Sequence, residues 1–378
     1  MALAYQFPSG YNGFIPNLNT TAQGGLMVEF SRNVESFKLN QYTQLQTVEV
    51  EAGKYWRFDQ NAMARVNTGD GSQFIWADGA DRPAQNMWQG FDMPAYTTTR
   101  LNFGFHLGDL ATYHAKKAGG VDLVAVNSKM VAGAAMVQRT RKALARLQDT
   151  TIMPYVNINT VNWNGTTGWG NFSKPSVIPT GLTQAHYWDQ GTSAYGGNAG
   201  NPYFRNGVNS ILSYIVQQSN GMVQPKDINI IMGPDTAIAL GQCNEVQDYV
   251  KQSPYALPAL LQDSTFGQYG LPSTLYGASK ILVEDVSYIS SNPLGSNTPT
   301  RSWALPYGTV IFASRPGGIE GSMQSYSTCM GFFLEEMSVE VFDSPIDRYV
   351  AGNVVDNYDY QITAPITGFV AQQVISGS

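Results

Sequence analysis

The chain has 378 residues and a formal net charge of −6; 43% of its residues are hydrophobic and only 13% are charged. This length can bury a sizeable core and predicts more than one domain. The acidic balance argues against tight, sequence-independent nucleic-acid binding, which relies on many Lys and Arg side chains.

The charged share is about half the usual ~25%, and the chain is rich in aromatic residues, with 21 Tyr and 7 Trp. Because interface cores lose charges and gain aromatic residues, this composition indicates surfaces that partners cover. A stable, β-rich secreted protein would have a similar composition, so that reading also stays open.

Two further patterns bear on the compartment. Cys243 and Cys329 are the two cysteines, too few for a disulfide framework. The N-terminus has neither the basic start nor the apolar run of a signal peptide, and no stretch reaches the ~18–20 apolar residues of a bilayer span. The sequence therefore predicts a protein that is made in a cytoplasm and does not enter a membrane.

The first third of the chain predicts an arm followed by a long β-ribbon. Residues 1–43 are rich in Gly, Pro and Asn at their start and contain one short amphipathic helix. From 44 to 105 the apolar period becomes two. A hairpin is expected around the turn Glu51-Ala52-Gly53, and a second strand pair over 73–76 and 95–103. Because two-stranded ribbons are marginal alone, this one is expected to lie on a neighbour.

A long helix is predicted from Val121 to Asp149, a stretch without proline. Its apolar residues recur at gaps of three and four, which places them in one stripe. The stripe consists of Leu123, Val126, Met130, Val137, Leu144 and Leu147. The basic residues near its end are Arg139, Arg141, Lys142 and Arg146. They could contact phosphates, but the preferred interpretation is that they complement the helix dipole and lie on a solvated face.

The rest of the chain alternates between strands and helices. Loops and short strands are expected over 151–201, a helix from Pro202 to Ser219, and a strand–helix–strand layer over 228–286. A surface loop is expected at 290–302. The remaining alternating segments return as strands; they cover 308–314, 330–343 and 354–375.

No constellation of residues predicts chemistry. His106, His114 and His186 lack metal-ligand spacing and are expected to be packed or solvated. A group of acids near the C-terminus, Asp343, Asp347, Asp356 and Asp359, could supply oxygens to Ca²⁺. Their spacing is not that of a calcium loop, so solvated acids are the preferred interpretation. The sequence predicts no catalytic residue, no cofactor and no metal.

Aromatic side chains gather in the loop-rich stretch: Trp163, Trp169, Phe172, Tyr187 and Trp188. Among Asn, Gly and Thr residues, such rings could stack on sugars. They could equally anchor a long loop onto a neighbouring subunit, and this second interpretation is preferred.

The order of these parts resembles the Hong Kong 97-type major capsid protein of tailed double-stranded DNA phages over essentially the whole chain. Residues 44–105 resemble its extended loop and 121–149 the spine helix of its peripheral domain. NPYFRNGVNSILSYI, INIIMGPDTAIAL and KILVEDVSYI resemble the elements of its axial domain. ALPYGTVIFASRPGG and FFLEEMSVEVFD resemble its return to the peripheral domain.

The resemblance implies an α+β fold in five parts. These are an arm with a short helix (1–43), an extended β-hairpin loop (44–105), a peripheral domain with the spine helix and a loop-rich insertion (106–200), an α/β axial domain (201–305), and return strands that are mostly peripheral (306–378).

The same resemblance implies a non-enzymatic shell protein of the virion, assembled in the host cytoplasm. It would form hexamers and pentamers of an icosahedral shell around double-stranded DNA that it contacts non-specifically. Scaffold, portal and decoration proteins are the further partners implied. The residues expected at subunit contacts are Tyr55, Trp56, Phe58, Trp76, Trp88, Trp163 and Trp169.

Three alternatives stay open at this point. An encapsulin-like compartment would use the same fold to hold cargo enzymes instead of DNA. A glycan-binding, β-rich adhesin would use the Trp-rich loop 163–188. A hydrolase with paired carboxylates ranks last, because no such pair stands out.

Overall fold

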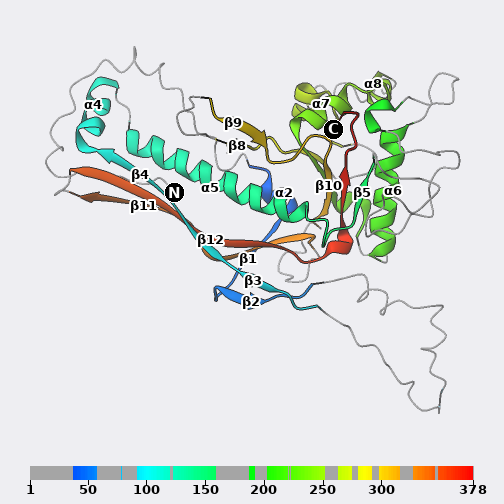
Figure 1. Ribbon diagram of the computed structural model, residues 1–378, viewed down its shortest axis with the longest axis horizontal. Helices are drawn as coiled ribbons and strands as arrows, with labels where there is room; N and C mark the ends of the chain where they lie inside the picture. Colours follow the sequence, from blue (N-terminus) through cyan, green and yellow to red (C-terminus); the bar gives the residue numbers. More distant parts are fainter. Residues whose placement is uncertain are drawn as a thin grey trace.

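The computed structural model describes residues 37–57, 78, 92–119, 122–158, 187–191, 202–219, 221, 223–251, 263–274, 280–291, 298–315, 327–344 and 348–377. A long helix lies along a strongly elongated sheet, and a second sheet with its own helices stands at one end of it (Figure 1). The predicted arm helix and the strand at 73–76 lie outside the described residues.

The elongated sheet has four strands in the order β1 (Gln44–Thr47), β11 (Cys329–Ser344), β12 (Tyr349–Ile362) and β4 (Thr99–Gly108). β12 runs antiparallel to both β11 and β4, while β1 runs parallel to β11. Helix α4 (Asp109–Gly119) follows β4 and leads back toward the long helix (Figure 1).

The long helix is α5 (Leu123–Leu147), within the predicted 121–149. We call it the spine helix. The Asp122 side chain caps it by accepting hydrogen bonds from the Val124 and Ala125 N–H groups. Its bounds confirm the prediction, but its predicted stripe is only partly right. Leu144 and Leu147 are buried, whereas Met130 is 47% exposed.

The buried face of the spine helix is built largely from small residues. It consists of Val124, Ser128, Ala132, Gly133, Ala135, Met136, Arg139, Thr140, Ala143, Leu144 and Leu147. Small residues suit this face because the sheet opposite it carries the large rings of Phe333, Tyr358 and Tyr360. Small side chains let the helix approach those rings closely, and interiors tolerate little overpacking.

The second sheet has five strands, in the order β5 (Tyr155–Asn157), β13 (Gly368–Gln372), β10 (Val310–Ser314), β6 (Ile228–Met232) and β7 (Lys280–Val283). Every residue of β6 and β10 is buried, as expected for strands covered on both faces. β6 and β7 are parallel, which confirms the predicted strand–helix–strand layer.

Helices cover both faces of this second sheet. On one face pack α6 (Tyr203–Gln218) and α7 (Pro234–Gly241). On the other face, the C-terminal end of the spine helix and the short α2 (Leu39–Tyr42) share a core with residues of both sheets. The two sheets therefore belong to one connected body. The smaller elements are α8 (Asn244–Lys251), α10 (Ser264–Tyr269), η5 (Trp188–Gln190), η6 (Pro225–Asp227) and η7 (Pro365–Thr367).

Strand pairing bears on three sequence predictions. β1 pairs with β11, and β2 (Ala52–Lys54) pairs with β3 (Ala95–Thr97), so no hairpin closes at the Glu51 turn. Within the segment 306–378, β11 and β12 lie in the elongated sheet, whereas β10 and β13 belong to the five-stranded sheet. The predicted surface loop 290–302 overlaps a hairpin of β8 (Ser287–Ser291) and β9 (Thr300–Trp303), which together include its first two and its last three residues.

Where the strand–helix–strand layer predicted one helix, α7 and α8 follow each other as two separate helices. At the break, Gly241 lies against the backbone of Tyr269 and Gly270, where a side chain would collide. Among the helices within the described ranges, none combines the length and apolar character that a bilayer span requires.

Candidate subunit-contact site

The base of the predicted extended loop is a short, tightly tied ribbon. β2 and β3 pair in antiparallel register from Ala52↔Thr97 to Lys54↔Ala95. The pairing continues beyond the strands, because the Tyr55 N–H donates to the Pro94 carbonyl and an isolated bridge joins Arg57 to Asp92. The side chains of Arg57 and Asp92 also form an ion pair. We call residues 51–57 and 92–98 the ribbon base.

The two faces of the ribbon base differ in character. Tyr55 and Tyr96, only 7% and 6% exposed, pack on Phe332 of β11. The Tyr96 and Phe332 rings are stacked, with centroids 4.6 Å apart and an interplanar angle of 11°. On the other face, Trp56 and Met93 are 56% and 43% exposed. By continuation of the ladder register these two residues lie opposite each other, so they form one outward apolar pair.

A buried carboxylate holds the ribbon base to the sheet. Asp359 of β12 is 3% exposed, and its Oδ2 accepts hydrogen bonds from the Thr97 N–H at 3.2 Å and from Gln361 Nε2 at 2.6 Å. Its Oδ1 lies 3.2 Å from Lys142 Nζ of the spine helix. One side chain thus connects the ribbon base, the sheet and the spine helix.

A second buried charge pair joins the spine helix to β12. Asp356 is fully buried, and both its oxygens accept hydrogen bonds from Arg139. Burial by itself lowers the pKa of Arg139, but the hydrogen bonds and charge of Asp356 outweigh that effect and raise its pKa above the ordinary value. The guanidinium carbon lies 4.5 Å from the Phe333 ring centroid, within cation–π range.

These pairs correct two sequence interpretations. Asp356 and Asp359 are not solvated acids, since they are 0% and 3% exposed. Arg139 is 9% exposed and does not belong to a solvated basic face. Both errors have one cause: the spine helix places its basic residues directly over the acidic strand, which a linear sequence does not reveal. Among the described residues, no three His, Cys, Asp or Glu side chains gather in a way that could hold a metal ion.

The seven predicted contact residues fall into two groups. Phe58, Trp76, Trp88, Trp163 and Trp169 lie outside the described residues. Of the others, Tyr55 faces its own sheet and Trp56 faces outward, so a contact with a neighbour stays a prediction that we carry forward for Trp56. Met93 and Asp359 were missed. Pairing β2 with β3 in the correct register places Met93 opposite Trp56, so that pairing would have identified Met93.

The described part of the Trp-rich stretch also needs a correction. Trp188 is 1% exposed and packs against Phe204, with ring centroids 5.5 Å apart. Because this ring is buried inside its own subunit, neither of its faces is accessible to a sugar or to a neighbouring subunit. Of the histidines, His106 packs at a tilt against Tyr349 with ring centroids 4.0 Å apart, His114 is exposed beside Tyr113, and His186 lies outside the described residues.

Comparison with known proteins gives matches of structure. No protein-family model matches the chain, and no curated protein matches its sequence significantly. A phage-related protein from Bordetella bronchiseptica superposes with a TM-score of 0.57 at 12% identity, covering 95% of this chain and 97% of that one. This match shows a shared fold over nearly the whole of both chains.

Two phage capsids are similar at lower scores. The capsid of cyanophage P-SCSP1u has a TM-score of 0.49 at 9% identity and covers 97% of this chain and 99% of its own. The mature capsid of bacteriophage PhiM1 has a TM-score of 0.48 at 10% identity, with 93% and 92% covered.

Proposed function

We propose that this chain, which has the Hong Kong 97-type fold, is a major capsid protein of a tailed phage. Many copies would form the hexamers and pentamers of an icosahedral shell that encloses double-stranded DNA, with no catalytic step. The observation that carries the proposal is the combination of a spine helix lying on an elongated sheet, a ribbon base projecting from that sheet, and a helix-covered second sheet at one end (Figure 1).

The outward face of the ribbon base supports this proposal. Trp56 and Met93 place apolar surface beside Arg57 and Asp92, where the described range 37–57 ends and the described range 92–119 begins. Large aromatic and Met side chains are enriched at the cores of protein interfaces. If each copy places its loop on one neighbour and is contacted by the loop of another, the interface is heterologous. Such an interface generates a ring when the rotation between successive copies closes.

The further partners follow from the same proposal. Packaged DNA would contact the inner face non-specifically. Because Lys and Arg make the contacts to DNA phosphates, a chain with a net charge of −6 is expected to make few of them. Scaffold, portal and decoration proteins would act during assembly in the host cytoplasm, and the mature protein would reside in the virion. The division into arm, extended loop, peripheral and axial domains is part of the proposal, with β10 and β13 moved to the axial sheet.

Negative-stain microscopy of the purified chain, combined with light scattering across a concentration series, tests the proposal. Rings or closed particles are the expected result. A chain that stays monomeric and fully ordered at high concentration contradicts it. The ultraviolet spectrum of nuclease-treated particles then separates a DNA container from an encapsulin-like compartment, because only protected nucleic acid keeps its absorbance at 260 nm.

A further inference from the structure

We infer that Asp359 is a positioning residue that sets the direction in which the ribbon base leaves the subunit. Its importance for assembly rests on the proposed function, because a loop must be aimed correctly to reach a neighbour. The direction itself is a property of one subunit and can be measured without a shell.

The β12–β4 ladder ends next to the ribbon base. Its last pair is Tyr358↔Thr99, and just before Thr99 the chain changes partner: β3 pairs with β2 instead of β12. The Thr97 N–H, which points away from β2, donates to the Asp359 side chain. Because a carboxylate reaches farther than a backbone carbonyl, the chain can stay attached to β12 while it leaves the sheet. Figure 1 shows β2 and β3 displaced from β12 where β4 still runs along it.

A second attachment lies beside the hydrogen bond between Asp359 and Thr97. Phe332 lies directly opposite Asp359 in the β11–β12 ladder, so both side chains are on the same face of the sheet. Phe332 stacks on Tyr96, and Asp359 binds Thr97, the next residue. These two neighbouring points, together with the Tyr55 hydroxyl that donates to the Ile362 carbonyl at 3.3 Å, fix the angle of the ribbon base.

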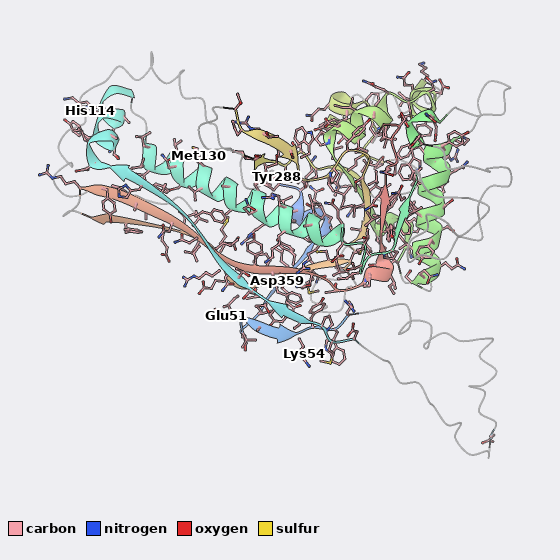
Figure 2. The ribbon with its side chains drawn as sticks, viewed as in Figure 1. Glu51, Lys54, His114, Met130, Tyr288 and Asp359 are labelled. Atoms are coloured by element: carbon pink, nitrogen blue, oxygen red, sulfur yellow. The ribbon has the colours of Figure 1, made fainter. Side chains whose placement is uncertain are left out.

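The Asp359 carboxylate is itself held by two side chains. Gln361 fixes Oδ2 and Lys142 of the spine helix fixes Oδ1. Figure 2 shows Asp359 between the spine helix and the ribbon base, which is labelled at Glu51 and Lys54. A carboxylate buried this deeply and held by hydrogen bonds has little rotamer freedom, so it transmits the position of the spine helix to the ribbon base.

Spin-label distance measurements on unassembled subunits test the inference. Labels are attached after Lys54→Cys on the ribbon base and Met130→Cys on the spine helix; both positions are exposed, while the natural thiols Cys243 and Cys329 are buried. The native chain is expected to give one narrow distance peak. Asp359→Ala is expected to lose that narrow peak, because the Thr97 N–H loses its partner. The aromatic contacts with Phe332 and the hydrogen bond from the Tyr55 hydroxyl to the Ile362 carbonyl then remain.

The matched control is Arg100→Ala, which removes a 4.0 Å pair with Glu335 whose side chains are 65% and 54% exposed. It is expected to leave the peak unchanged. If Asp359→Ala does not fold, the near-isosteric Asp359→Asn, which removes the charge facing Lys142, replaces it and is expected to broaden the peak. A peak in the folded Asp359 variant as narrow as the native one, at the same distance, overturns the inference, as does equal broadening by Arg100→Ala.

The outcome is separable from that of the proposed function. A native subunit with a narrow peak that never assembles refutes the shell proposal and leaves the inference standing. Shells that form normally from an Asp359 variant with a native distance refute the inference alone.

Discussion

Arg139 of the spine helix and Asp356 of β12 form a bidentate ion pair inside the protein, with Nη2 2.5 Å from Oδ1 and Nε 2.6 Å from Oδ2. The pair is nearly inaccessible, with side-chain exposures of 11% and 0%. Around it the helix contributes mainly small residues, which pack in many similar ways. We therefore interpret this pair as the contact that selects one register of the spine helix on the sheet, a role attested for some buried polar groups.

Removing one partner of this pair should be costly. Arg139→Met leaves Asp356 buried and unpaired, and we expect a loss of about 3–5 kcal/mol in the free energy of unfolding. Urea titration followed by circular dichroism measures it. The double variant Arg139→Met with Asp356→Leu should recover much of the loss, because no uncompensated charge remains. A single variant within about 0.5 kcal/mol of the native chain would contradict this account.

Gly207 of α6 should not tolerate a side chain. A β-carbon there would lie 2.5 Å from Nε1 and 2.7 Å from Cε2 of the buried Trp188 indole. Since this rigid ring cannot move without opening the core, Gly207→Ala is expected to lower the unfolding free energy by about 1–3 kcal/mol. Thermal unfolding measures the change.

The matched control for that variant is Gly267→Ala in α10, where an added β-carbon meets nothing within 4 Å. It should be neutral or stabilising by up to about 1 kcal/mol, because alanine favours a helix more than glycine does. Equal losses at both positions would show that the Trp188 contact is not the cause.

Both thiols should be unreactive in the folded chain. Burial raises the pKa of Cys243 to about 11 and that of Cys329 to about 12, so neither forms a thiolate at pH 8. Reaction with an aromatic disulfide reagent is expected to be slow in the native protein and complete after unfolding. Rapid reaction of either thiol in the native state would contradict the burial.

The same shifts give a pH dependence of known sign. A raised folded pKa means that the folded state favours the neutral thiol. The stabilisation is full below the ordinary pKa of 9.0 and is lost as pH rises toward 12. Replacing both cysteines by Ala should therefore flatten part of the stability decline above pH 9.0, measured by urea unfolding at each pH. An unchanged slope would argue against this contribution.

Trp56→Ala should weaken assembly far more than folding. The side chain is mostly exposed on the outward face of the ribbon base, so we expect the unfolding free energy to change by about 0.5 kcal/mol or less. The concentration needed for rings or particles should rise, as light scattering can show. Ile289→Ser, which removes a residue 53% exposed on β8, is the comparison. If the two variants assemble alike, the outward face of the ribbon base is not a privileged contact.

Local patterns predicted the parts of the fold that depend on one segment at a time. The spine helix, the helix α6 and the parallel β6–β7 layer all occur where they were expected. In each case a single periodicity of 3.6 or 2, bounded by Pro, Gly or Asp, specifies the element. The buried face of the spine helix was predicted only in part, because Met130 of its expected stripe is exposed.

The tertiary structure decided which strands pair and which charges are buried. A strand with period two is compatible with any partner, so neither the β1–β11 pairing nor the place of β10 and β13 could be read from their own residues. Likewise, a carboxylate looks the same in sequence whether it is solvated or buried. Asp356 and Asp359 became structural residues only because folding placed Arg139 and Lys142 beside them, and desolvation makes such a partner necessary.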